Sequence, residues 1–155
     1  MVDISKMPGH LIRRLNQISA SIFADHMARA DYDFTPVQFA ALSTILENPG
    51  LDQATLAGLI AYDRATMGGV IDRLEAKQLL TRSISLTDRR ARQLYLTDKG
   101  RQTLAALEPL VSALQGEILQ GLDDGEKEQL LGLLEKATNA GNQLSRAPLQ
   151  KKRAS

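Results

Sequence analysis

Two short helical segments follow one another almost without a linker in the middle of the chain, and this feature most constrains the fold. Asp52 and Asp63 are suited to cap the segments QATLAGLIA and RATMGGVIDRLEAK, which meet at Ala61-Tyr62. So tight a junction predicts a helix-turn-helix over about residues 53–76. Many helical hairpins share this pattern without touching DNA, so the pattern alone leaves the function open.

A small β-hairpin is predicted directly after these helices. LLTRSIS and RQLYL are short runs with β-branched and aromatic side chains, and the polar segment LTDRRA between them suits a hairpin tip. A basic hairpin after a helix-turn-helix is the wing of a winged helix. We therefore predict a wing over about residues 79–97.

Longer helices are predicted on both sides of this core. One spans about residues 8–30, and an almost wholly apolar one starts after the N-cap Thr35 and ends at Asn48-Pro49-Gly50. Another restarts at Thr97-Asp98 and contains Pro109, which should bend it. A last helix covers about residues 123–144.

The predicted fold class is thus mostly α: an α+β winged helix-turn-helix of about six helices with a two-stranded β wing. We predict a single domain over residues 8–145. The tail, residues 146–155, is polar and basic and is expected to be disordered.

Composition argues against most enzyme and metal chemistry. The chain has no cysteine and only two histidines, His10 and His26, and these lack metal-ligand spacing. Phosphate-binding loops and nucleophile elbows have no matching motif. We expect neither an enzyme nor a metal or cofactor site. No apolar run could cross a membrane and the N-terminus does not resemble a signal peptide, so a cytoplasmic protein is expected.

Charge is unevenly distributed along the chain. Between Asp63 and Arg101 there are nine basic and five acidic residues, whereas the whole chain has a net charge of +1. A polyanionic partner for this segment is the simplest functional interpretation. A solvated charged surface is the alternative.

The segments DRATMGGVIDRLEAKQLLTR and LTDRRARQLYLTDKG strongly resemble the multiple antibiotic resistance regulator (MarR) family of bacterial transcription factors. The wing signature, D-R-R followed by a basic residue and L-T-x-x-G, is specific. The resemblance implies a dimeric repressor whose recognition helices enter successive major grooves of a pseudo-palindromic DNA operator. Its wings would reach the flanking minor grooves, and residues 8–30 and 98–145 would form the homodimer interface.

The resemblance also implies which residues contact DNA. On the recognition helix these are Arg64, Ala65, Thr66, Gly68, Gly69 and Arg73. In the wing, Asp88 and Arg90 match a pair in which the acid holds an arginine that enters the minor groove, while Arg89 and Arg92 would contact phosphates. A narrow A·T-rich minor groove does attract arginine, although Asp88 also suits a turn.

Gly68 and Gly69 stand inside a predicted helix, where each glycine costs roughly 1 kcal/mol relative to alanine. Met67, Val70, Ile71 and Leu74 make the core-facing stripe, so the glycines lie outside it. A bare face would let the helix approach DNA closely. Family members often have a larger or basic side chain where Gly69 stands. The alternative to a role in DNA approach is that glycine is simply tolerated at these exposed positions.

A ligand is suggested at the start of the first helix. His10, Arg14 and Gln17 share one helical face, and an arginine there could bind a carboxylate through two hydrogen bonds. The segment PGHLIRRL resembles family members that regulate aromatic-acid catabolism. This favours a small aromatic acid or its coenzyme A thioester as the ligand that releases DNA. A solvated or interface-paired stripe is the alternative.

Two questions stay open at this point. The flanking helices have more apolar surface than one small core requires, which dimerisation or packing within the chain could explain. A constitutive or architectural DNA-binding protein without ligand control would have the same winged core.

Overall fold

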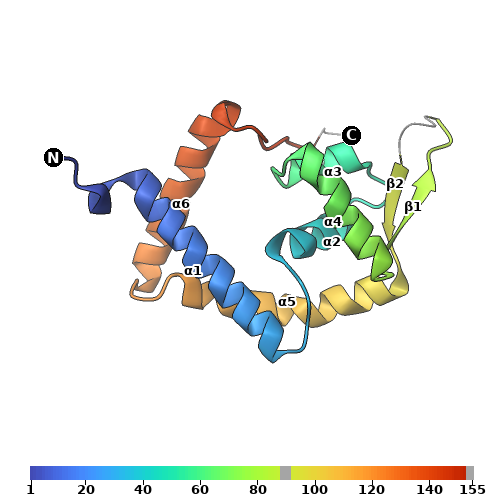
Figure 1. Cartoon of the computed structure of the whole chain (residues 1–155), viewed down its shortest axis with the longest axis horizontal. Coiled ribbons are helices and arrows are strands. Elements are labelled where there is room, and N and C mark those ends of the chain that lie inside the picture. Colours follow the sequence, from blue (N-terminus) through green and yellow to red (C-terminus); the bar gives the residue numbers. More distant parts are fainter. Residues whose placement is uncertain (88–91, 153–155) are drawn as a thin grey trace.

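A computed structural model describes residues 1–87 and 92–152 of the chain (Figure 1). Its elements are η1 (Ile4–Lys6), α1 (Pro8–Arg29), α2 (Pro36–Glu47), α3 (Gln53–Leu59), α4 (Arg64–Ala76), β1 (Leu80–Ile84), β2 (Arg92–Leu96), α5 (Asp98–Ile118), α6 (Asp124–Gly141) and η2 (Asn142–Leu144). The described residues are mostly helical with one antiparallel hairpin. The expected winged helix-turn-helix is confirmed.

Local side-chain caps define where α2 and α3 begin. The Thr35 hydroxyl accepts a hydrogen bond from the Gln38 backbone N–H, and the Gln38 side chain accepts one from the Thr35 N–H, forming a capping box. Asp52 Oδ1 accepts from the Thr55 N–H at 2.7 Å. These bonds satisfy N–H groups that a helix leaves unpaired at its start. The apolar helix α2 is central, as predicted, since its Ala41, Leu42 and Ile45 are fully buried.

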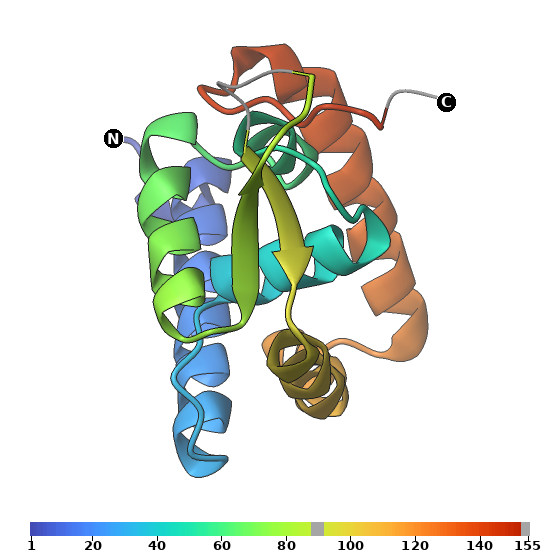
Figure 2. The same ribbon diagram turned by 90° about the vertical axis from the view of Figure 1, so that its right-hand side faces the viewer.

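The hairpin packs on this helical core (Figure 2). β1 and β2 pair antiparallel from Leu80 opposite Leu96 to Ile84 opposite Arg92. The chain before α3 joins the same sheet, because the Gly50 N–H donates to Leu94 O and the Leu94 N–H donates to Leu51 O, both at 2.9 Å. The hairpin is therefore hydrogen-bonded to the start of the helix-turn-helix.

The L-T-x-x-G signature has a structural cause at the start of α5. Thr97 is the N-cap residue, and its hydroxyl accepts from the Gly100 N–H at 2.9 Å. Gly100 is buried, and a Cβ there would lie 2.0 Å from Leu79 O. Only glycine lets α5 pass this close to the start of the hairpin.

Two groups of buried residues hold the molecule together. The larger joins α2, α3, α4 and the hairpin to Leu104 of α5. The smaller joins α1 to α5 through Phe23, Met27, Leu107 and Leu114. In Figure 1 the winged core lies at the right and α1 and α6 at the left, with α5 running below both.

Several details differ from the sequence predictions. Asp63 precedes α4, but its side chain makes no capping bond; the Thr66 hydroxyl instead donates to the Asp63 carbonyl oxygen at 3.0 Å. α3 ends at Leu59 because Ala61 has φ of 52°. α6 ends at Gly141, before the predicted residue 144. Pro109, in contrast, lies inside α5 as predicted, and the bend expected there stays a prediction.

Residues 145–152 form defined hydrogen bonds, although composition predicts a disordered tail over residues 146–155; residues 153–155 lie outside the described residues. The Gln150 N–H donates to Gly58 O on α3 at 2.8 Å. Asn142 forms two hydrogen bonds with the main chain of Leu149. Composition predicts disorder from low hydrophobicity alone, whereas these are backbone contacts that composition does not encode.

Candidate nucleic-acid interface

The outer face of α4, meaning the side turned away from the core, has few large side chains and carries Arg64 and Arg73. Met67, Val70, Ile71 and Leu74 are buried on the inner side, as the helical spacing predicted. The predicted DNA-contacting residues of the helix are exposed, except for the half-buried Gly68; the exposed ones are Arg64, Ala65, Thr66, Gly69 and Arg73. The helix therefore presents a surface with two arginines and few large side chains.

Gly68 and Gly69 differ in what surrounds them. An added Cβ at Gly69 would meet nothing within 4 Å. One at Gly68 would lie 3.4 Å from Gln53 Nε2 at the start of α3. Gly69 thus leaves open surface, and a methyl group at Gly68 would contact only the end of the Gln53 side chain, a polar neighbour of α4 that the sequence analysis did not name.

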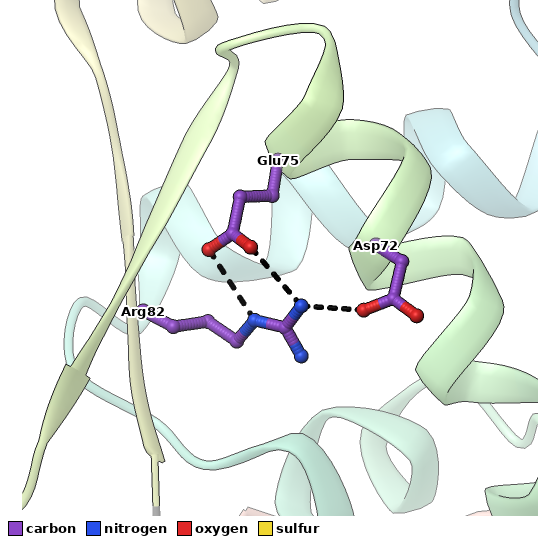
Figure 3. A network of polar contacts seen from close by, with 3 residues as sticks. All are labelled: Asp72, Glu75 and Arg82. Atoms are coloured by element: carbon purple, nitrogen blue, oxygen red, sulfur yellow. Dashed lines mark hydrogen bonds and ion pairs between the residues drawn. The ribbon is translucent and has the colours of Figure 1, made fainter.

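Arg82 on β1 connects the hairpin to α4 (Figure 3). Its Nε and Nη2 donate to the two Glu75 oxygens at 3.3 and 3.1 Å, and Nη2 also donates to Asp72. The hydrogen bonds to Glu75 and then Asp72 raise the pKa of Arg82 above its already high ordinary value. The guanidinium therefore links the hairpin to α4, and its positive charge offsets one of the two negative charges of Asp72 and Glu75.

Arg82 was not among the predicted site residues. The signal was available as two acids three residues apart on one side of α4, followed by a lone arginine within a β-type run. Side chains at positions i and i+3 of a helix are neighbours.

The structure describes only part of the predicted wing. Arg92 is exposed at the start of β2, opposite Ile84. Asp88, Arg89 and Arg90 lie outside the described residues. Their predicted roles in the minor groove and on phosphates stay predictions.

The candidate ligand residues are arranged differently from the prediction. Arg13, not Arg14, connects the other two: its Nη1 donates to Gln17 Oε1 at 3.1 Å, and its Nη2 lies 3.4 Å from His10 Nδ1. Positions 10, 13 and 17 share a helical face as well as 10, 14 and 17 do, so spacing could not decide between the two arginines.

An apolar groove of about 530 Å³ lies between α1, α5 and α6. Ile12 and Leu15 line one side, Ile118 another, and Leu131 and Leu134 the third. His10, Arg14 and Gln17 do not line it.

Within residues 1–87 and 92–152, no group of histidine and acidic side chains could hold a metal ion. No helix in these ranges is long and apolar enough to span a bilayer.

This geometry agrees with comparisons to known proteins. The MarR family model matches residues 34–91. The repressor NicR of Pseudomonas putida, an HTH-type transcriptional repressor, is 31% identical over 134 residues, covering 86% of this chain and 84% of NicR. The chain belongs to the MarR family. It is therefore a transcriptional regulator of that family rather than an enzyme.

Another MarR-type relative is a protein of Thauera aromatica assigned to transcriptional regulation of the hcr operon. It is 38% identical over 102 residues, which cover 66% of this chain and 61% of that protein.

Solved structures of MarR-type regulators have the same fold. BpsR of Bordetella bronchiseptica, whose DNA binding is regulated by 6-hydroxynicotinic acid, has a TM-score of 0.83 and 29% identity, covering 90% of this chain and 98% of BpsR. The repressor CouR, bound to a 23-mer DNA duplex, has a TM-score of 0.79 and 29% identity, covering 89% of this chain and 99% of CouR.

Proposed function

We propose that this chain is a dimeric, sequence-specific DNA-binding repressor that a small aromatic acid releases from its operator. The observation that carries the proposal is the outer face of α4, exposed and nearly bare, beside a hairpin fixed to it by Arg82. A helix enters the major groove of B-DNA only if its outward side chains leave room for the base edges. Such a role on bacterial DNA belongs in the cytoplasm.

The DNA-contacting set remains the predicted one. Arg64, Thr66 and Arg73 on α4 supply donors for bases and phosphates, and Gly68 and Gly69 allow close approach. In the wing, Arg90 enters the minor groove, oriented by Asp88, while Arg89 and Arg92 contact phosphates. CouR was solved on a DNA duplex, which supports the use of this fold on DNA.

Dimerisation is supported by the apolar surface of the terminal helices. No residue of α6 is buried, and even its apolar side chains Leu131 and Leu133 are 58% and 56% exposed. In α1, Leu11, Ile12 and Ile18 are exposed too. Ile12 of α1 and Leu131 of α6 line one apolar groove, and exposed apolar surface shared between elements marks an interaction site. We assign it to a second copy of the chain, through residues 8–30 and 98–145.

The ligand proposal rests on α1 and on the aromatic acid that regulates BpsR. Among the described residues, the Arg14 side chain has no hydrogen-bond or ion-pair partner, so its guanidinium can bind a carboxylate, while Arg13 holds His10 and Gln17 in place. The ligand class is a small aromatic acid or its coenzyme A thioester.

Selection from a random pool of duplexes tests the DNA-binding claim. We expect recovered sequences to share a pseudo-palindrome whose half-site centres are about one helical turn apart. Competition with unselected DNA should give a specificity ratio of about 10³ or more. A ratio near one with a steep salt dependence would identify an architectural DNA-binding protein instead.

A thermal-shift screen of benzoates, hydroxybenzoates, phenylacrylates and their thioesters tests the ligand claim. At least one compound should both stabilise the protein and weaken its complex with the selected duplex. Arg14→Ala should abolish this response, whereas Arg13→Ala should only weaken it. The reverse order would assign the carboxylate to Arg13, and the absence of any such compound would leave a constitutive regulator.

A further inference from the structure

The C-terminal segment, residues 145–152, crosses from the end of α6 to the helix-turn-helix. Asn142 holds it on one side: Nδ2 donates to Leu149 O at 3.0 Å, and Oδ1 accepts from the Leu149 N–H at 2.8 Å. On the other side the Gln150 N–H donates to Gly58 O at 2.8 Å. Carbonyls in the last turn of a helix lack partners within the helix. Gly58 O already accepts from the Ala61 N–H at 3.3 Å, and its second lone pair takes the bond from the Gln150 N–H.

Gly58 makes this approach possible. A Cβ at this position would lie 2.6 Å from Gln150 Cγ and 3.0 Å from Gln150 Cβ. Glycine inside a helix costs about 1 kcal/mol relative to alanine. The contact with the C-terminal segment gives a physical reason for glycine here.

This path brings several cations together at the start of α4. Arg64, Lys151 and Lys152 line one hollow of about 610 Å³. Arg64 and Arg146 line a neighbouring hollow of about 280 Å³. Each hollow also contains one acid, Asp52 in the first and Asp63 in the second, and the Asp52 carboxylate already accepts the capping bond from the Thr55 N–H. Four cations against two acids leave an excess of positive charge.

These cations lie beside the elements that we propose to contact DNA, α4 and the hairpin. Arg64 is the first residue of the recognition helix. In Figure 1 the end of the C-terminal segment and the outer end of β1 lie on the same upper side. A duplex in contact with both α4 and the hairpin would pass close to Lys151 and Lys152.

We infer that the C-terminal segment is an additional phosphate-binding element, in which Lys151 and Lys152 join Arg64 against the DNA backbone. The inference rests on the proposed DNA-binding function. Lysine is a flexible point charge, and phosphate contacts position a protein without reading sequence. The segment therefore strengthens binding to every duplex and leaves the choice of operator to α4 and the wing.

The test measures affinity for the selected duplex as a function of salt. Lys151→Gln/Lys152→Gln should bind about tenfold more weakly at low salt. The slope of log K against log[salt] should fall by about one to two per protomer, because each phosphate contact contributes about 0.9. The ratio of specific to random binding should stay the same. Lys6→Gln, outside both the DNA-contacting set and the proposed dimer interface, also removes a lysine charge and should leave the slope nearly unchanged.

A second variant separates the defined path from a loose basic tail. Asn142→Ala with Gly58→Ala keeps both lysines but removes the amide bonds and places a methyl group against Gln150. We expect the affinity of this variant for the selected duplex to lie between that of the unmodified chain and that of the double lysine variant. Unchanged affinity in this variant, or an unchanged slope in the double lysine variant, would overturn the inference. Failure of the unmodified chain to prefer any duplex would instead overturn the proposed function.

Discussion

Gly69 and Gly100 have opposite surroundings. Gly69 is exposed on α4 with open space beyond it, so any partner it admits lies outside the chain. Gly100 is buried against Leu79 O of the same chain. We therefore propose that glycine serves DNA binding at position 69, whereas at position 100 it is required for folding.

Replacing Gly69 by leucine tests the first role. The fold should persist, since leucine is a better helix former and no atom lies within 4 Å. Affinity for the selected duplex should fall about tenfold or more, comparable to losing one good base contact. Gly69→Ala, with a small side chain, should stabilise the helix and reduce affinity far less. Equal affinity of all three proteins in equilibrium titrations would show that the glycine is incidental.

Gly100→Ala tests the second role. The new methyl group would overlap Leu79 O at 2.0 Å, so α5 or the hairpin must shift. Overpacking of a core costs about 1–3 kcal/mol. Urea denaturation should therefore show a loss of about 2 kcal/mol or more in the free energy of unfolding. Gly116→Ala, on the same helix with nothing within 4 Å, is the control and should be neutral or stabilising; equal stability of the two variants would contradict this assignment.

At the scale of elements, Arg82 sets how the hairpin sits on α4. Arg82→Gln should cost about 1 kcal/mol of unfolding free energy, at the upper end for exposed ion pairs because two acids share the guanidinium. Its raised pKa means that the stabilisation is fully present below the ordinary pKa of arginine, and thus throughout the neutral range.

Arg101→Gln is the matched control for this change. Arg101 has a single 3.8 Å ion pair with Asp98, and its loss should be nearly silent. DNA affinity should fall in Arg82→Gln beyond any loss in Arg101→Gln, since Asp72 and Glu75 would then repel phosphates. Equal effects of the two substitutions on affinity would remove Arg82 from the interface.

The elements could be predicted wherever their cause is local in sequence. Thr35 with Gln38, and Asp52 with Thr55, cap helices through neighbours three residues apart. Contacts between distant residues have no such local cause: the sequence offers charged candidates such as Asp72, Glu75 and Arg82 but does not specify which of them pair. Arg82 pairs with acids seven and ten residues earlier, and Gln150 bonds to Gly58 across most of the chain. Which arginine bonds to His10 and Gln17 depends on side-chain direction, and helical spacing does not specify that direction.

At the scale of the whole molecule, the exposed leucines of α6 predict a dimer. Leu131→Asp/Leu134→Asp places charges in the apolar groove shared with α1 and α5. We expect sedimentation analysis to show a dimer for the unmodified chain and a monomer for this variant. Leu86→Asp, a fully exposed leucine beyond β1, should stay dimeric. A monomeric unmodified chain would refute the dimer.

Footprinting of the unmodified protein on the selected duplex tests the central claim most directly. We predict two protected stretches of major groove, with centres about one helical turn apart on one face of the DNA, flanked by protected minor grooves. Uniform protection that does not depend on sequence would contradict the account.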